Sequence, residues 1–262
     1  MNRTANPHEF QLQNESTGDK IINRTLANNI DTDTDTLESL VSHDDFYVRR
    51  AVAGNYNTSR FSLAKLGDDV EEQVRFYLAA NPKTPVEVLE KLADDESDDV
   101  RSQVAGNPNT PVKILEKLAT DDHLETLRLL AENSQTPTNV LSQVGDKLLK
   151  LAQERLFYSH ESSTLRAIAS NHNTPVQILE QICSVDDGHN QYWLLALSVA
   201  QNPYTPAYLL EKLAQHQDVE VRRSIASHPR TPAATLEKLA TDKEQVVTQA
   251  IQQRFAISGE KR

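Results

Sequence analysis

The stretch NPNTPVKILEKLATDD, residues 107–122, decides the fold because near copies of it recur along the chain. They read NPKTPVEVLEKLADDE at 81–96, NPYTPAYLLEKLA at 202–214 and HPRTPAATLEKLATD at 228–242. A sequence that repeats at a fixed interval predicts an array of stacked structural units.

The residue that opens each copy sets a register that extends beyond these four copies. These register residues are Asn29, Asn55, Asn81, Asn107, Asn133, Asn171, Asn202 and His228. The first four steps are 26 residues each, the next two are 38 and 31 residues, and the last is 26 again. The pattern predicts about eight repeats of roughly 26 residues.

Each repeat reads as two short helices. Gly106 and Asn107 tolerate left-handed backbone and Pro108 blocks helical continuation, so the first helix should end there. A Thr-Pro pair then starts the second helix, and the spacing of Thr84 and Glu87 predicts a capping box. Helices this short are unstable alone, so their apolar faces must pack on neighbouring repeats.

The two ends of the chain depart from the pattern. Residues 1–22 are polar and without period, so we expect a flexible tail. Residues 23–262 should then form a single repeat solenoid. Its terminal repeats, near 26–47 and 246–262, follow the motif only in part, as capping repeats do.

Two insertions, near 145–162 and 186–193, account for the longer steps. Both fall between the second helix of one repeat and the first helix of the next, which predicts one shared edge. Insertions on one face of a solenoid often mark a binding face, and aromatic side chains anchor interfaces. Packing against the irregular repeats is the other interpretation. The candidate binding residues here are Phe157, Tyr158, His160, Tyr192 and Trp193.

The unit VRSQVAGNPNTPVKILEKLATD, residues 100–121, resembles the leucine-rich repeat variant family. The motif is almost unbroken also at 74–95 and 221–242, and the resemblance covers roughly residues 26–255. It implies an all-α, right-handed solenoid of the HEAT or armadillo kind, in which α-helices alternate with short 3₁₀-type helices. No catalytic residue belongs to this repeat.

Some members of that family carry a cysteine-ligated iron–sulfur module ahead of the repeats. The single cysteine of this chain, Cys183, lies far into the repeats, so the resemblance does not carry that cofactor over. One thiol also makes no internal disulfide. The run DTDTD at 31–35 lacks the glycine and glutamate of a calcium loop, and we expect it to cap a helix. We therefore expect no metal and no cofactor.

Charge and composition restrict the function further. The net charge is −11, which does not favour binding to nucleic acid or to an anionic membrane. The polar first residues contain no secretion signal, and no apolar run is long enough to cross a bilayer. We therefore expect a cytoplasmic location and no membrane association.

Two rows of polar residues recur with the repeat. The register asparagines are either a binding row or, as Asn chemistry favours, groups that bond the turn between helices. The arginines of the first helices either recognise an acidic ligand or form ion pairs between repeats. The candidate binding arginines are Arg75, Arg101, Arg128, Arg166 and Arg222, and Arg49, Arg50 and Arg223 belong to the same pattern.

These observations predict a non-catalytic helical-repeat scaffold or adaptor that binds a partner protein through an extended surface. One alternative is a HEAT-like nucleic-acid-binding protein of the DNA-glycosylase type, suggested by Arg166, Asp186, Asp187 and Trp193. The other is a purely structural assembly subunit. The sequence sets neither the partner nor the oligomeric state.

Overall fold

The structure is a computed structural model that describes residues 17–153, 159–185 and 193–258. Within these residues it contains 17 helices and no strand. The chain divides into two compact units, residues 1–109 and 110–262, and each is described by itself. Among the described residues, no helix combines the length and apolarity needed to cross a membrane.

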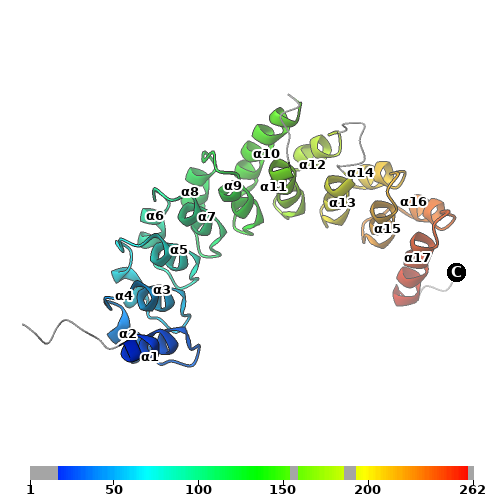
Figure 1. Ribbon diagram of the computed structural model, residues 1–262. Helices are drawn as coiled ribbons and strands as arrows, with labels where there is room; N and C mark the ends of the chain where they lie inside the picture. The colour runs from blue at the N-terminus through cyan, green and yellow to red at the C-terminus, as the bar shows by residue number, and fades with distance from the viewer. Residues whose placement is uncertain (1–16, 154–158, 186–192, 259–262) are drawn as a thin grey trace, which may run out of the picture. The chain divides into compact units, whose positions relative to one another are not determined.

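The first unit contains the helices α1 (Thr17–Asn28), α2 (Thr34–Leu40), α3 (Phe46–Gly54), α4 (Arg60–Lys65), α5 (Glu72–Ala80), α6 (Val86–Leu92) and α7 (Asp98–Gly106). The odd-numbered helices pack on one another in chain order, α1 on α3, α3 on α5 and α5 on α7. They form one layer, and the shorter even-numbered helices lie along its other side (Figure 1).

The second unit contains the helices α8 (Val112–Leu118), α9 (Leu124–Glu132), α10 (Thr138–Gln153), α11 (Ser159–Ser170), α12 (Val176–Ile182), α13 (Trp193–Gln201), α14 (Ala207–Leu213), α15 (Val219–Ser227), α16 (Ala233–Leu239) and α17 (Gln245–Ser258). Its odd-numbered helices pack in the same way from α9 to α17. The expected all-α repeat fold is confirmed, since successive helix pairs repeat about every 26 residues.

Core packing explains why such short helices form. In the third repeat, Val74 and Leu78 of α5 are fully buried, as are Leu89 and almost all of Leu92 on α6. Each buried leucine side chain contributes roughly 1.5–3 kcal/mol, which a helix of seven residues does not provide through its own hydrogen bonds. The helices are therefore stabilised by their neighbours.

Two expectations about the helices need correction. The second helices, which the family resemblance implied to be 3₁₀-type, are short α-helices, as in α6, where the Leu89 amide bonds the Pro85 carbonyl. Hydrogen bonds of the 3₁₀ type, between residues three apart, occur at the helix ends, such as those from the Val88 amide to the Pro85 carbonyl and from the Asp95 amide to the Leu92 carbonyl. Residues 17–22, expected to belong to a flexible tail, are helical, because α1 begins at Thr17, and residues 1–16 lie outside the described structure.

The threonine of the Thr-Pro pair does not cap the second helix. Pro85 occupies the N-cap position of α6, and no side chain caps that helix end. The hydroxyl of Thr84, which is buried, instead donates to the carbonyl of Leu78 at 2.5 Å. It thus gives a second donor to a carbonyl in the last turn of the first helix, which also accepts the amide of Asn81 at 3.1 Å. The same bond to the carbonyl six residues earlier occurs at Thr32, Thr58, Thr136, Thr174, Thr205 and Thr231.

The first insertion lengthens a helix. Helix α10 has 16 residues where α8 and α12 have 7, and its added turns bury Leu148 and Leu149. Residues 154–158 and 186–192 lie outside the described structure. At the end of the chain, α17 stands where the terminal capping repeat was expected.

Candidate functional site

The register asparagines join consecutive repeats through their side chains. The Asn81 amide nitrogen donates to the carbonyls of Ala53 at 2.7 Å and Asn55 at 3.1 Å, both in the preceding repeat. Its oxygen accepts the amide of Lys83 at 2.9 Å, which closes the turn. We call this series the asparagine ladder. It also includes Asn55, Asn107, Asn171 and Asn202.

Two other residue types continue the ladder at its end. His228 reproduces both functions of asparagine: its Nε2 lies 3.0 Å from the Asn202 carbonyl and its Nδ1 accepts the amide of Arg230 at 3.2 Å. Burial lowers the pKa of His228 below its ordinary value. Arg254 stands one step later, and its guanidinium donates to the carbonyls of His228 and Pro229. The asparagine row is therefore structural, and its side chains are not free for a ligand.

The recurring arginines separate into two rows. Arg49, Arg75, Arg101 and Arg222 stand six residues before a register residue, whereas Arg50, Arg128, Arg166 and Arg223 stand five residues before one. One residue along an α-helix is a rotation of about 100°. The two rows therefore have different surroundings, although the sequence pattern treated them as one.

The first row is occupied by ion pairs, which we call the arginine–aspartate ladder. Arg75 donates through Nε and Nη2 to Asp95, at 2.6 Å and 3.1 Å, and through Nη1 to the carbonyls of Asp69 and Val70. The same geometry joins Arg222 to Asp242, with both side chains more than nine-tenths buried. The hydrogen bonding that Arg222 donates to Asp242 raises the pKa of Arg222 and holds the pKa of Asp242 below its ordinary value.

Three predicted binding arginines are thereby accounted for in the framework. Arg75 and Arg222 use four of their five donors within the protein, and Arg101 donates to the carbonyls of Asp95 and Glu96 and pairs with Asp98. A ligand would have to displace these bonds. Ion pairing is therefore the interpretation that the structure supports for these three residues.

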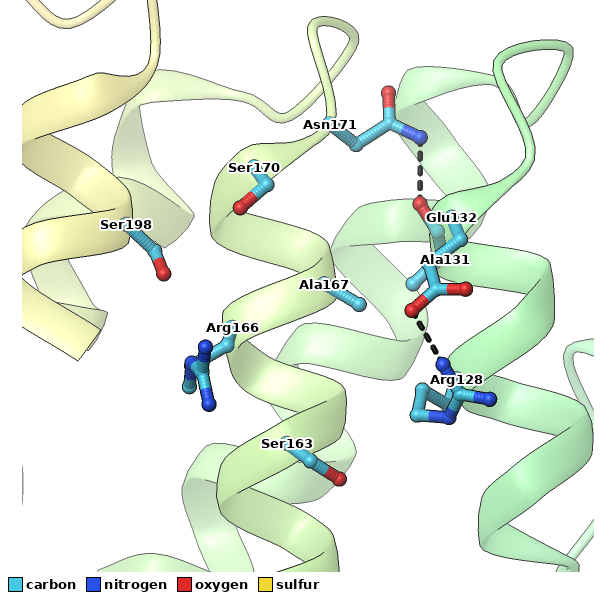
Figure 2. Close-up of a pocket in the computed structure, with 9 residues that line it drawn as sticks. All are labelled: Arg128, Ala131, Glu132, Ser163, Arg166, Ala167, Ser170, Asn171 and Ser198. Carbon is cyan, nitrogen blue, oxygen red and sulfur yellow. Dashed lines mark hydrogen bonds and ion pairs between the residues drawn. The ribbon is translucent and has the colours of Figure 1, made fainter. Parts of the chain in front are cut away.

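The other two predicted arginines line one pocket of the second unit, of about 410 Å³ (Figure 2). Arg128, on α9, is held by Glu125 and Glu132. Arg166, on α11, is exposed and has no carboxylate partner among the described residues. In Figure 2 it extends on the side of Ser198, whereas Arg128 and Glu132 lie on the side of α9. The pocket thus already contains a carboxylate beside its cations.

The structure describes only some of the insertion residues that we predicted to bind a partner. Phe157, Tyr158 and Tyr192 lie outside the described residues, and so does the side chain of His160, although its backbone belongs to α11. Trp193 begins α13 and is half-buried. Insertion residues of this group are therefore retained as candidates on the sequence argument alone.

A second pocket, of about 380 Å³, lies in the first unit between α1, α3 and α5. Arg50 is its one charged lining residue; the remaining lining is Ala27, Asn28, Ile30, Ala51, Gly54, Asn55, Tyr56 and Tyr77. A Cβ on Gly54 would lie 3.2 Å from the Tyr77 ring, so glycine keeps this part of the pocket open.

Aromatic rings surround Arg50. Its guanidinium carbon lies 5.1 Å from the centre of the Tyr47 ring and 5.6 Å from that of Tyr77, which is cation–π distance. Its Nη1 donates to Gln73 at 2.9 Å, and no carboxylate among the described residues pairs with it. Sequence reasoning placed Arg50 in the arginine row and missed the tyrosines. Their signal was the gathering of aromatics in the second and third repeats of a chain with only 5% aromatic residues.

Two further sequence candidates have structural roles. Asp33, in the DTDTD run, caps α2 by accepting the Thr36 amide at 2.8 Å, as expected. Among the described residues, no group of three or more metal-ligating side chains gathers. Cys183 is a half-buried free thiol, and burial raises its pKa to about 12, so it stays protonated.

The helix pairs, the two ladders and the exposed grooves define an α-helical repeat protein. Residues 72–97 and 98–123 match the family model described as leucine rich repeat variant, which confirms the resemblance for these two repeats. A solved structure described as a leucine-rich repeat variant with a novel repetitive protein structural motif is similar in fold. It shares 18% identity at a TM-score of 0.54, over 88% of this chain and 86% of that one. No curated protein sequence matches significantly.

Proposed function

We propose that this protein is a non-catalytic scaffold or adaptor that binds a partner protein through the exposed surface of its repeats. The observation that carries the proposal is a set of apolar and aromatic side chains left exposed on the first three repeats. Ile30 is 81% exposed and Tyr56 65%, and Tyr47 and Tyr77 lie nearby on α3 and α5. Aromatic residues in such positions are typical anchors of protein interfaces.

The use of the polar motif residues supports the same proposal. The asparagines, threonines and ladder arginines are hydrogen-bonded within the protein, and no buried polar side-chain atom of the described residues lacks a partner. The framework is thereby rigid, so binding would order few groups and lose little conformational entropy. We also propose a reducing, cytoplasmic location, because Cys183 is a free thiol.

The insertion surface is a second candidate contact. It comprises Phe157, Tyr158, His160, Tyr192 and Trp193, with Arg166 exposed on the adjoining helix α11. The half-buried Trp193 favours it, as does Arg166, which pairs with no carboxylate among the described residues. It is separable from the first surface because the two lie in different units of the chain.

The test is capture of a partner by the full chain, followed by purification of that partner and measurement of its affinity. We expect the double variant Ile30→Ser and Tyr56→Ser to weaken binding by about tenfold or more. The control is Tyr204→Ser with Tyr208→Ser, which removes two exposed aromatic rings from the second unit. A third variant changes Tyr158, Tyr192 and Trp193 to alanine, and a loss confined to it would move the contact to the insertions.

Failure to bind any protein would overturn the proposal. Retarded migration of duplex DNA at low salt would favour the nucleic-acid alternative. Sedimentation of the isolated chain that increases with its concentration would favour a structural assembly subunit.

A further inference from the structure

We propose that the pocket between α1, α3 and α5 binds an acidic residue of an extended partner peptide, with Arg50 as the recognition residue. This inference rests on the scaffold function and specifies the chemistry of its contact. It concerns the first unit alone, where the exposed apolar side chains gather.

Charge is the first argument. Arg50 is the one charged residue among those that line the pocket, and no described carboxylate pairs with it. This is unusual in a chain of net charge −11, where Arg24, Arg49 and Arg75 on the same helix layer all pair with aspartates. A guanidinium with free donors in a pocket without acidic residues is complementary to a carboxylate.

The position of the guanidinium is the second argument. Contact with Tyr47 and Tyr77 and the bond from Nη1 to Gln73 hold the Arg50 side chain in one place and leave other N–H groups unused. Little side-chain entropy is then lost when a carboxylate binds. The rings also exclude water from one side of the ion pair, which strengthens it.

The apolar walls indicate what accompanies the carboxylate. Ala27, Ala51 and Ile30 line the pocket, and about 380 Å³ accommodates one acidic side chain with an apolar neighbour. Ile30 and Tyr56, on the turns that follow α1 and α3, are exposed at one end of the pocket, and Tyr47, in the first turn of α3, is exposed beyond its other end. A surface open in both directions suits an internal segment of a chain, so we commit to an aspartate or glutamate rather than a terminal carboxylate.

The pocket between α9, α11 and α13 differs because a carboxylate lines it. Its lining includes Glu132, and Arg128 there is paired with both Glu125 and Glu132. An acidic ligand at that place would meet repulsion as well as attraction. The chemistry therefore assigns the acidic residue to the Arg50 pocket.

Three short peptides serve as probes. Two are blocked at both ends and have the sequences Gly-Leu-Glu-Leu-Gly and Gly-Leu-Gln-Leu-Gly. The third is the glutamine peptide with a free carboxyl terminus. The full chain is titrated with each while the arginine Nε–H signals are followed by ¹H–¹⁵N NMR. The Arg50 signal is assigned from its loss in Arg50→Gln. We expect it to shift saturably with the glutamate peptide and to respond weakly to the other two.

Arg50→Gln should weaken the glutamate peptide by about tenfold. Arg223→Gln, at the equivalent position of α15, should leave the affinity unchanged, and Arg50→Lys should give an intermediate loss because it keeps the charge without the planar fork. Circular dichroism verifies that each variant is folded. Equal binding of the glutamate and blocked glutamine peptides, equal binding by Arg50→Gln, or tighter binding of the free-carboxyl peptide would overturn the proposal.

Comparison with the captured partner separates the two proposals. If the partner binds Arg50→Gln as well as it binds the natural chain, the pocket proposal fails and the scaffold function stands. If the glutamate peptide binds while no partner protein does, the pocket stands and the scaffold function fails.

Discussion

Arg49 and Asp69 are 20 residues apart and form a bidentate ion pair, with Nε 2.6 Å from one carboxylate oxygen and Nη2 3.0 Å from the other. Asp69 precedes the first helix of the next repeat, and its backbone carbonyl accepts from Arg75. The pair therefore connects two repeats and leads to the next pair. The same 20-residue geometry recurs at Arg222.

Removal of Arg222 should destabilise the chain strongly. Arg222→Ala leaves the carboxylate of Asp242 buried without its counter-ion, which should lower the free energy of unfolding by about 3 kcal/mol. Arg223→Ala, one residue later and half-exposed, should cost about 0.5 kcal/mol or less. The midpoint of urea unfolding followed by circular dichroism measures both. An equal effect of the two variants would contradict the ladder.

The double change Arg222→Met with Asp242→Leu distinguishes the net contribution of the buried ion pair from the cost of leaving one of its charges buried alone. Because both charges disappear together, the loss should be much smaller than that of Arg222→Ala alone. Urea unfolding again measures it. A double variant as unstable as the single one would show that the backbone bonds of Arg222, not its pairing with Asp242, dominate.

The asparagine ladder predicts an order of substitutions at Asn81. Asn81→Ala removes three buried or part-buried hydrogen bonds, two of them to carbonyls of the preceding repeat, so we expect a loss of about 2–3 kcal/mol. Asn81→His should be tolerated better than Asn81→Ala, because His228 makes the corresponding bonds with its two ring nitrogens. Thermal unfolding of the two variants checks this order, and the reverse order would refute the equivalence.

His228 predicts a loss of stability in weak acid. Burial lowers the pKa of His228 in the folded chain below the ordinary 6.5, so the unfolded chain takes up the proton first. The free energy of unfolding should therefore be constant above about pH 6.5 and fall as the pH drops below that value. His216, whose pKa burial also lowers, adds to the fall.

The variant His228→Asn should reduce this dependence. Urea midpoints measured between about pH 5 and 8 should decline less steeply than in the natural chain, with the contribution of His216 remaining. The ladder itself should persist, since asparagine is the usual residue there. Unchanged pH dependence in His228→Asn would show that His228 does not titrate differently on folding.

Threonine in the Thr-Pro pair should act through the first helix. Thr205→Val keeps the shape of the side chain and removes the bond to the Val199 carbonyl, which is 2.6 Å long and buried. We expect a loss of about 1–2 kcal/mol, and a smaller loss for Thr205→Ser, which keeps the hydroxyl. If hydrogen exchange shows that Thr205→Val loosens α14 but leaves α13 protected, the capping role would be correct after all.

The repeat fold could be predicted because the same pattern of helix ends, helix starts and apolar residues recurs many times, and short amphipathic helices in register have few ways to pack. The candidate sites could not be predicted, because they depend on the direction in which each side chain points. Arg49 and Arg50 are neighbours in sequence, yet one completes an ion pair between repeats and the other lines a pocket. An alignment of the repeats that ignores a shift of one residue puts the two arginines in one row. The signal that distinguishes the ion-pairing row is the 20-residue spacing between its arginines and an aspartate.

Thr84 shows a second limit of local reasoning. A threonine followed by proline and, three residues on, by glutamate has the composition of a helix start, but composition does not state which group the buried hydroxyl reaches. It reaches the carbonyl of Leu78, which also accepts the amide of Asn81. The Arg50 pocket exceeded sequence reasoning for a related reason. Its walls come from three consecutive repeats, and equivalent positions of the motif, such as Ala51 and Tyr77, hold different side chains there.

The asparagine ladder is independent of the length of chain between its members. Asn171 bonds the Asn133 carbonyl at 3.1 Å across 38 residues, and Asn202 bonds the Asn171 carbonyl at 3.0 Å across 31, as closely as Asn81 bonds Asn55 across 26. The asparagine bonds thus fix the spacing of the repeats along one edge. At the opposite edge, the length of the connecting chain can vary. Foreign segments, such as a fluorescent reporter or a catalytic domain, should be accepted at that second edge without altering the spacing of the repeats.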